Sequence, residues 1–426
     1  MLSLCTPMVF SRSPIFDGKN PKYAEDVARF VEKKEFLKKL TNEILGVSQA
    51  TSEKSFGNIS EIEENPFIFE GDIIVTEDQL DEMILDAQNR LMEKKTPDLI
   101  REKRAAFVKN SSHLWIMPIP YYIGAGVNEK AVLAGIERWE QETCIRFERR
   151  PSNKSDENMI LFVIGKQCAS SVGMLGGVQE IVLNGGCYDL GSVCHEIAHA
   201  LGMVHEHARP DRDEHITINT NNIDVKRIGN FLPQPSFDYR RTYDYGSLMH
   251  YSQNSFAINK SIPTMITKNP YYQETIGHSD GPSFIDVHIM NEAYCGNPNN
   301  CDQCKCPPPY TGRLCDTVTS TCGNDLTATA DPQTLTVESA KTCTIVINVP
   351  SRDHRVNVTI TELDFNADDR CLNDYVDLYW QDDVHRAPTR FCMKKPAPIV
   401  SFLNKFLVVY KSRRTNSRFS MTYHAV

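Results

Sequence analysis

The stretch His195-Glu196-Ile197-Ala198-His199-Ala200-Leu201-Gly202-Met203-Val204-His205-Glu206 decides the fold class of this chain. Its first two histidines are four residues apart, so a helix places both on one face, where their imidazoles can converge on one ion. Gly202 can take the left-handed conformation that ends a helix, and the turned chain can then bring His205 to the same ion. The spacing predicts one zinc ion held by His195, His199 and His205.

The glutamate beside the first histidine fits the chemistry of such an ion. Three neutral imidazoles leave zinc its full charge and one open position, where a bound water acidifies to about neutral pH. Glu196 is placed to act as general base for this water and later to hand the proton to a leaving amine. Pairs of histidines at this spacing also arise by chance on structural helices. A third histidine, together with the glutamate and the glycine, makes chance a poor explanation.

Length and charge limit the remaining possibilities. At 426 residues the chain is too long for one core and predicts several domains. The net charge of −9 is spread along the sequence, which argues against a nucleic-acid partner, because such a partner requires a basic face. The sequence lacks any run of about eighteen apolar residues, so it predicts no membrane span.

The cysteines indicate an oxidising compartment. Only Cys5 precedes Cys144, whereas the other thirteen cysteines fall between Cys144 and Cys392, which predicts disulfides and secretion. The segment Met1–Phe10 is a poor signal peptide, because it is short, lacks a basic start and is interrupted by Pro7. Five N-x-S/T triplets agree weakly with secretion and are candidate glycosylation sites: Asn58, Asn110, Asn153, Asn259 and Asn357.

The first 104 residues are predicted to form an N-terminal pro-segment. Apolar residues at helical spacing predict helices over Ala24–Leu45 and Gln79–Leu91. The segment ends at Arg101-Glu102-Lys103-Arg104, a basic tetrapeptide of the kind that proprotein convertases cut, so we expect cleavage between Arg104 and Ala105. A charged helix end is the alternative interpretation, but a change of composition follows directly.

Residues from His113 onward predict a mixed α/β domain, a small cysteine-rich segment and an all-β module. In the mixed α/β domain, strands are expected over Trp115–Ile123, Met159–Ile164 and Glu180–Leu183, and helices over Glu129–Cys144 and Leu190–Leu201. The segment Cys301–Cys315 is too small for an apolar core. Beyond Cys322 a period of two predicts strands over Thr342–Val349, Val356–Leu363, Tyr375–Trp380 and Ile399–Tyr410.

The extended zinc-binding pattern resembles a known family. The order H-E-x-x-H-x-x-G-x-x-H is the metzincin signature, and Glu206 with the residues after it resembles the astacin family, including its nematode members. Ser247-Leu248-Met249-His250-Tyr251 is similar to the Met-turn of that family. The resemblance covers residues 105–295 and implies a two-lobed α/β (α+β) domain with a cleft. It further implies that Met249 forms the floor beneath the metal, that Tyr251 stabilises the oxyanion and that Glu206 contacts the mature N-terminus.

The same resemblance gives a role to the pro-segment. The tetrapeptide Phe69-Glu70-Gly71-Asp72 is similar to a motif of astacin pro-segments whose aspartate binds zinc in place of the catalytic water. Asp72 is therefore expected to keep the precursor inactive, since a carboxylate is a competent zinc ligand.

The resemblance extends to the C-terminal residues. Residues 296–320 look like part of an EGF-like module, and residues 321–426 resemble a CUB domain. We expect no calcium in this CUB-like domain, because Asn366 and Arg413 stand where acids would accompany Asp374. Cys194 is expected to be a buried free thiol, and the pairing of Cys301 and Cys304 stays open. The implied disulfides are Cys144–Cys295, Cys168–Cys187, Cys306–Cys315, Cys322–Cys343 and Cys371–Cys392.

The sequence thus predicts a secreted zinc endopeptidase of the astacin type, made as a zymogen, in which a zinc-bound water attacks the scissile carbonyl. Its expected partners are extracellular protein or peptide substrates and an activating proprotein convertase, and the CUB-like domain is a candidate for protein recognition. A matrix-binding protein with a silent protease fold is a second hypothesis, which the presence of every catalytic residue disfavours. Another metzincin type, such as a matrixin, is a third, which Glu206 and the CUB-like tail disfavour.

Overall fold

The structure is a computed structural model that describes residues 23–47, 66–95, 113–153, 157–234, 236, 241–277, 280–296, 306–312, 315–365 and 371–426. Several residues singled out in the sequence lie outside these ranges: Cys5, Asn58, Arg104, Ala105, Asn110, Cys301, Cys304 and Asn366. The chain forms two compact units. The first consists of Met1–Arg212, Ile218–Arg240 and Phe256–Thr264, and the second of Asp213–Thr217, Arg241–Ser255 and Met265–Val426.

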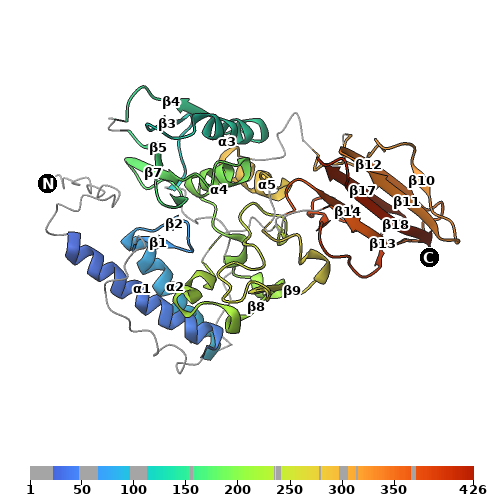
Figure 1. Ribbon diagram of the computed structural model, residues 1–426. Coiled ribbons are helices and arrows are strands. Elements are labelled where there is room, and N and C mark those ends of the chain that lie inside the picture. Colours follow the sequence, from blue (N-terminus) through green and yellow to red (C-terminus); the bar gives the residue numbers. More distant parts are fainter. Residues whose placement is uncertain are drawn as a thin grey trace. The chain divides into compact units, whose positions relative to one another are not determined.

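A seven-stranded mixed sheet forms the framework of the first unit (Figure 1), with the strand order β1-β2-β6-β7-β5-β3-β4. Its central strands are parallel, β6 runs antiparallel to β7, and β2 runs parallel to β6. The strands are β1 (Ile68–Phe69), β2 (Ile73–Ile74), β3 (Ile119–Ile123), β4 (Phe147–Arg149), β5 (Met159–Ile164), β6 (Ala169–Ser171) and β7 (Val178–Leu183).

Strand β3 is shorter than expected, because Trp115 packs elsewhere. The sequence predicts a strand that begins at Trp115, whereas β3 begins at Ile119. The indole of Trp115 is buried, and its Nε1–H donates a 2.8 Å hydrogen bond to the carbonyl of Ala200, at the end of helix α4 (Leu190–Ala200).

Two helices that adjoin the sheet position the zinc-binding stretch. Helices α3 (Glu129–Glu142) and α4 begin after the N-caps Asn128 and Asp189, as expected for residues whose side chains accept backbone N–H groups. A Cβ at Gly135 of α3 would lie 2.5 Å from Val193 of α4, so this close packing requires glycine. The indole of Trp139 donates a 3.1 Å hydrogen bond to the carbonyl of Cys194 and fixes α4 from the α3 side.

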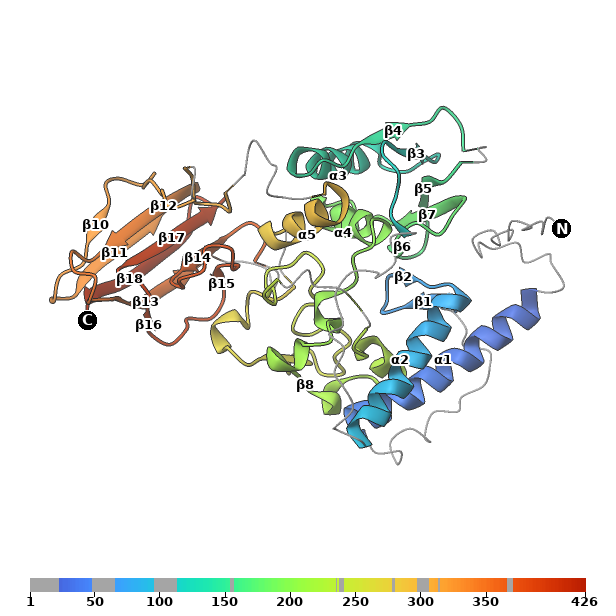
Figure 2. The same cartoon turned by 180° about the vertical axis from the view of Figure 1, so that it is seen from behind.

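The described residues up to Lys95 fold into two helices with a β-hairpin between them. Helices α1 (Tyr23–Leu45) and α2 (Glu77–Lys95) lie side by side (Figure 1) and are joined by ion pairs from Arg29 and Lys33 to Glu77. Their apolar faces share a core with the hairpin, and Val172, Val204 and Leu232 complete it. Seen from behind, β1 and β2 lie at the edge of the sheet next to β6 (Figure 2).

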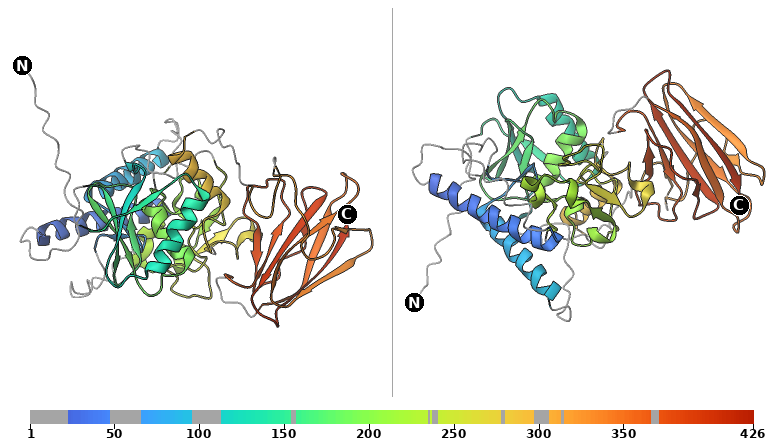
Figure 3. Two further views of the ribbon diagram at one scale, coloured as in Figure 1. Left: turned by 90° about the horizontal axis from the view of Figure 1, so that it is seen from above. Right: turned by 60° about the horizontal axis from the view of Figure 1, so that its bottom comes forward.

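The C-terminal residues form a β-sandwich in the second unit, seen as two facing layers in Figure 3. One sheet has the order β10-β12-β17-β14-β15 and the other β11-β18-β13-β16. The strands are β10 (Leu326–Thr327), β11 (Gln333–Glu338), β12 (Lys341–Asn348), β13 (Val356–Asp364), β14 (Tyr375–Tyr379), β15 (Thr389–Phe391), β16 (Ile399–Val400), β17 (Lys405–Ser412) and β18 (Arg418–Ala425).

The prediction of one strand over Ile399–Tyr410 is wrong. The chain turns at residues 401–404, and β16 and β17 belong to different sheets. Within the turn, the hydroxyl of Ser401 donates to the carbonyl of Leu403, and the N–H of Phe402 donates to the carbonyl of Trp380. Phe402 and Leu403 are exposed apolar residues, so the sequence stays apolar through the turn and resembles one continuous strand.

The remaining elements are short. Helix α5 (Phe284–Tyr294) begins with a capping box at Ser283, and β8 (Ile216–Ile218) pairs with β9 (Met265–Thr267). The 3-10 helices are η5 (Glu206–Ala208), η6 (Arg212–Glu214), η7 (Thr220–Asn222), η8 (Val225–Phe231) and η9 (Pro270–Tyr272). In the part of the chain that is described, every helix is too short or too polar to cross a membrane.

The disulfides have the connectivity that the sequence analysis expected where both cysteines are described within one unit. These bonds are Cys168–Cys187, Cys306–Cys315, Cys322–Cys343 and Cys371–Cys392. Cys144 and Cys295 are both disulfide-bonded, and their pairing with each other stays a prediction. Cys194 is a buried free thiol, and burial raises its pKa to about 12.

Candidate metal centre

The local backbone places the three histidines as their spacing predicts. His195 and His199 lie one turn apart on α4, which ends at Ala200. Gly202 has φ +109°, and its N–H donates to the carbonyl of His199, so the chain leaves the helix through a left-handed glycine. His205 then stands at the start of η5 with an extended backbone.

The three imidazoles and the carboxylate of Asp72 converge. Ring centroids of His195, His199 and His205 lie 4.6 to 5.3 Å apart. Asp72 Oδ2 lies 3.3 Å from Nε2 of both His195 and His205, and Asp72 Oδ1 lies 3.9 Å from Nε2 of His199. All four ligand atoms fall within 4.8 Å of one another. Two ligand atoms at about 2.0–2.1 Å from a tetrahedral zinc ion are about 3.3 Å apart, so the set has the size of a zinc site.

The donor chemistry also fits a metal ion. Within the described residues, Asp72 Oδ1, His199 Nε2 and Glu196 Oε2 are buried atoms that form no hydrogen bond, a costly arrangement unless an ion lies between them. His199 Nδ1 lies 2.8 Å from the carbonyl of Met203, an acceptor to which Nδ1–H donates. This tautomer leaves the lone pair of Nε2 directed at the shared point, as for histidine ligands in general.

The carboxylates at the centre favour a positive charge beside them. Burial lowers the pKa of His205, but the carboxylates of Asp72 and Glu70 outweigh burial and raise this pKa to about 10. Burial and the neighbouring histidines lower the pKa of His199 well below its usual range. The carboxylates of Asp72 and Glu70 thus favour a positive charge at the point that the three imidazoles share. Burial, followed by the charge of Asp72, raises the pKa of Glu196 well above its usual range.

Two residues of this centre were missed by the sequence reasoning. Glu70 is 1% exposed, and its Oε2 lies 2.5 Å from Nδ1 of His205. Gln234 donates a 2.8 Å hydrogen bond from Nε2 to Glu70 Oε1. The only sequence signal for Glu70 is its place two residues before Asp72, and Gln234 has no signal in the pattern.

Glu206 already has a cationic neighbour in this structure. Arg209 is fully buried, and its Nη1 donates a 3.0 Å hydrogen bond to Glu206 Oε1. The same guanidinium donates two further hydrogen bonds to Asp211. The predicted contact of Glu206 with the mature N-terminus stays a prediction, because Ala105 lies outside the described residues.

Met249 and Tyr251 belong to the second unit, and both side chains are buried. The turn before them is fixed by Asp286 at the start of α5, which accepts hydrogen bonds from the Ser247 hydroxyl at 2.6 Å and the Leu248 N–H at 2.8 Å. The structure thus fixes the backbone of this turn, and the predicted roles of Met249 and Tyr251 at the metal stay predictions.

Asp374, the acid of the CUB-like sandwich that could have bound calcium, already accepts hydrogen bonds. Asp374 is 4% exposed, and its Oδ1 accepts hydrogen bonds from the Ser412 hydroxyl at 2.6 Å and the Arg413 N–H at 3.0 Å. Arg414 Nε lies 3.4 Å from the second carboxylate oxygen. Asp374 is therefore already paired with hydrogen-bond donors and an arginine side chain, and the expected absence of calcium stays a prediction.

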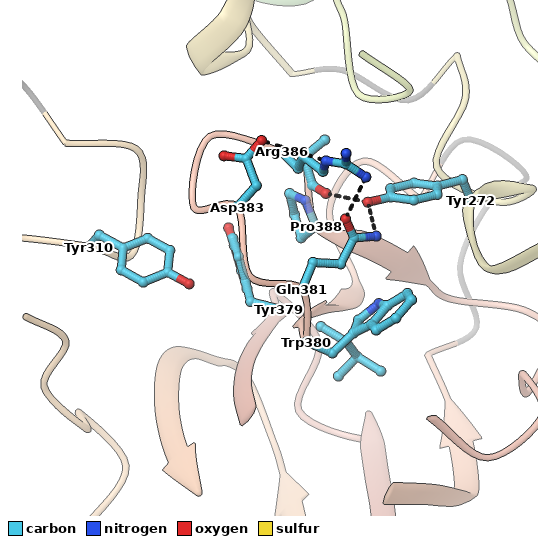
Figure 4. A pocket seen from close by; sticks show the side chains of 10 residues that line it. Tyr272, Tyr310, Tyr379, Trp380, Gln381, Asp383, Arg386 and Pro388 are labelled. Atoms are coloured by element: carbon cyan, nitrogen blue, oxygen red, sulfur yellow. Dashed lines mark hydrogen bonds and ion pairs between the residues drawn. The ribbon is translucent and has the colours of Figure 1, made fainter. Parts of the chain in front are cut away.

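A small pocket lies in the second unit, and its lining residues do not include the four candidate zinc ligands. It has room for about one water molecule and is lined by Tyr272, Tyr310, Tyr379, Trp380, Gln381 and Arg386, among others (Figure 4). The hydroxyl of Tyr272 accepts a hydrogen bond from Gln381 and donates one to the carbonyl of Ala387.

The described glycosylation candidates differ in exposure. Asn153 and Asn259 are exposed, whereas Asn357 lies within β13 and is half-buried, with its Nδ2 3.4 Å from His424 Nε2. Attachment of a glycan requires an accessible side-chain amide, so the structure favours Asn153 and Asn259.

Comparisons with known proteins agree with this centre. Residues 107–295 match the family model of the astacin peptidases, and residues 315–423 match that of the CUB domain. Zinc metalloproteinase nas-34 of Caenorhabditis elegans is 37% identical over an alignment of 463 residues. The alignment covers 99% of this chain and 76% of the relative. Zinc metalloproteinase nas-30 of the same organism is 33% identical over 368 residues, which cover 80% of this chain and 48% of the relative.

A solved structure matches part of the chain. High choriolytic enzyme 1, a hatching enzyme zinc-protease from Oryzias latipes, is 33% identical, with a TM-score of 0.41, over 44% of this chain and 96% of that chain. The chain spans about three quarters of the length of nas-34 and about half that of nas-30. Because the match to nas-34 covers 99% of this chain at 37% identity, the chain belongs to the astacin family of zinc metalloproteinases.

Proposed function

We propose that this chain is the precursor of a secreted endopeptidase that cleaves extracellular proteins, with one zinc ion held by His195, His199 and His205. The observation that carries the proposal is the convergence of three imidazoles and the carboxylate of Asp72 within 4.8 Å. The proposed division is a pro-segment over residues 1–104, a protease domain over 105–295, an EGF-like segment over 296–320 and a CUB domain over 321–426.

The chemistry would be shared between the metal and two side chains. When bound, zinc supplies a Lewis acid that polarises the scissile carbonyl and lowers the pKa of water. Glu196 would accept the proton from the attacking water and pass it to the leaving amine, since it follows the first ligand directly and its carboxylate is buried. Tyr251 would donate a hydrogen bond to the oxyanion, and Met249 would form the apolar floor beneath the ligands.

Latency would depend on Asp72 until the pro-segment is removed. Its carboxylate points at the three imidazoles and would fill the fourth position of the ion. A proprotein convertase would cut after Arg104, release the hairpin and create a new α-amino group at Ala105. This group would join the buried pair of Glu206 and Arg209.

An extended polypeptide is the substrate that fits the sheet edge. In the precursor, β2 pairs with β6 and occupies this edge. Once the pro-segment has left, a substrate segment could add to β6 as a strand through main-chain hydrogen bonds, which are independent of side-chain identity. The CUB domain would contribute protein recognition without calcium, since Arg413 and Arg414 contact Asp374. Glycans are proposed at Asn153 and Asn259.

Metal analysis of the mature form, residues 105–426, tests the proposal directly. One zinc per chain is expected, and a chelator should abolish cleavage of a peptide substrate until zinc is restored. A His205→Ala variant is the matched control, because it should fold and lose the metal. Well-folded mature protein without stoichiometric zinc would contradict the proposal.

A further inference from the structure

The hairpin turn that carries Asp72 also contacts the opposite edge of His205. Asp72 Oδ2 lies 3.3 Å from Nε2 of this histidine, and Glu70 Oε2 lies 2.5 Å from its Nδ1. Two residues of one short turn therefore contact both ring nitrogens of a single ligand. For comparison, Nδ1 of His199 contacts the carbonyl of Met203, which stays in the chain after activation.

The position of Glu70 is built by its surroundings. Its second carboxylate oxygen accepts the hydrogen bond from Gln234, and the side chain is almost fully buried. Glu70 has φ +50° and Gly71 has φ +88°, so the turn holds two consecutive residues in the left-handed region. A non-glycine residue in this region is uncommon and persists where the surrounding structure fixes it.

The hairpin is anchored on both sides of this turn. Lys34 of α1 donates hydrogen bonds from Nζ to the carbonyls of Pro66 at 3.0 Å and Ile68 at 2.6 Å. On the other side, the N–H of Ser170 in β6 donates a 2.8 Å hydrogen bond to the carbonyl of Asp72. These contacts fix the position of the turn relative to His205 from both ends.

We propose that Glu70 is a positioning residue for His205 in the precursor. It accepts the Nδ1 proton, which leaves the Nε2 lone pair directed at the metal, and it fixes the rotation of the ring. This inference rests on the zinc site of the proposed function and adds a second effect of the pro-segment. Asp72 fills the fourth position, whereas Glu70 strengthens one of the three histidine ligands.

The proposal has a consequence for metal affinity. An outer carboxylate that orients a histidine ligand typically changes metal affinity about 10–100-fold. Glu70 leaves with the pro-segment, so its contribution exists only in the precursor. The precursor should therefore hold zinc more tightly than the mature form for two separable reasons.

Zinc competition with a chromogenic chelator tests the role of Glu70. The precursor is kept uncleaved by Arg104→Ala, and in this background Glu70→Gln is compared with Glu82→Gln, the same change at an exposed pro-segment residue. Glu70→Gln should lower the zinc affinity of the precursor about tenfold or more, whereas Glu82→Gln should leave it unchanged. Asp72→Ala provides the comparison for loss of the fourth ligand.

The mature form supplies a second measurement. Mature enzyme released from a Glu70→Gln precursor with an intact Arg104 should match the wild-type enzyme in zinc affinity and turnover, because residue 70 is no longer present. Should Glu70→Gln fail to fold, Glu70→Asp, which keeps the charge but shortens the side chain, gives the same comparison. A folded Glu70 variant whose precursor holds zinc as tightly as wild type would overturn the proposal. Absence of zinc from the wild-type precursor and mature form would instead refute the proposed function.

Discussion

Arg209 Nη1 donates a 3.0 Å hydrogen bond to Glu206 Oε1 at a site where both side chains are buried. The carboxylate that follows the third histidine is therefore charge-compensated in the full chain, before the proposed cleavage. A new N-terminus would join this pair, and its effect would be to order the neighbouring chain instead of neutralising a buried charge.

Asp72→Ala in an uncleaved precursor should give partial activity. The substitution removes the carboxylate that points at the three imidazoles but leaves the rest of the pro-segment and its tethered N-terminus in place. Full activity should require cleavage after Arg104. Peptide hydrolysis by the precursor before and after convertase treatment measures both states, with Asp81→Ala on α2 as the control. A silent Asp72→Ala precursor would show that steric coverage alone maintains latency.

Glu196→Gln in the mature enzyme should retain zinc and lose turnover by several orders of magnitude. The change removes the proton acceptor but none of the three imidazole ligands. Zinc content and kcat are measured on the same preparation, with Glu137→Gln on the exposed side of α3 as the control. Near-normal kcat would mean that another group accepts the proton.

Tyr251→Phe should lower kcat about a hundredfold, as loss of one oxyanion donor typically does, and should leave zinc content unchanged. The substitution removes only the hydroxyl, while the buried aromatic ring and the turn held by Asp286 remain. Tyr188→Phe serves as the control for a phenol outside this turn. A change in KM with an unaltered kcat would place Tyr251 in substrate binding and not in transition-state stabilisation.

The CUB domain should unfold at the same temperature with and without millimolar calcium. Asn366 and Arg413 stand where two further acids would be expected, and Asp374 is already paired with the Arg413 N–H and the Arg414 side chain, so a cation would find too few free carboxylates. Thermal unfolding of the full mature chain measures this, and a double variant, Asn366→Glu with Arg413→Asp, should become calcium-sensitive. Calcium stabilisation of the wild-type chain would show that the acidic positions were misassigned.

Cys194 should resist alkylation in the folded protein. Burial raises the pKa of its thiol to about 12, so between pH 7 and pH 9 the group is almost entirely the unreactive thiol. Iodoacetamide at pH 8 followed by peptide mass spectrometry should find this residue modified only after unfolding in guanidinium. Rapid labelling of the native chain would contradict its burial.

The histidine centre could be predicted because its geometry is local. His195 and His199 share one helix turn, and Gly202 supplies the left-handed residue that returns the chain to His205. Helix periods likewise predicted α1 to α4 to within a few residues.

The contacts of the hairpin formed by β1 and β2 could not be predicted in the same way. Glu70 lies 135 residues from His205 and 164 residues from Gln234, so no local pattern relates them. Strands β1 and β2 have two residues each, too few to show a period. The turn at residues 401–404 was missed for the opposite reason, because Phe402 and Leu403 imitate a strand.

The pairing of β2 with β6 also bears on how the two forms of the enzyme can be kept in solution. An uncovered strand edge is a template for aggregation, and in the full chain β2 shields Ser170 and Ser171. Release of the proposed pro-segment would open this edge, although it is only three residues long. The uncleaved chain would then be the form suited to storage at high concentration, and the cleaved enzyme should self-associate more readily as its concentration rises.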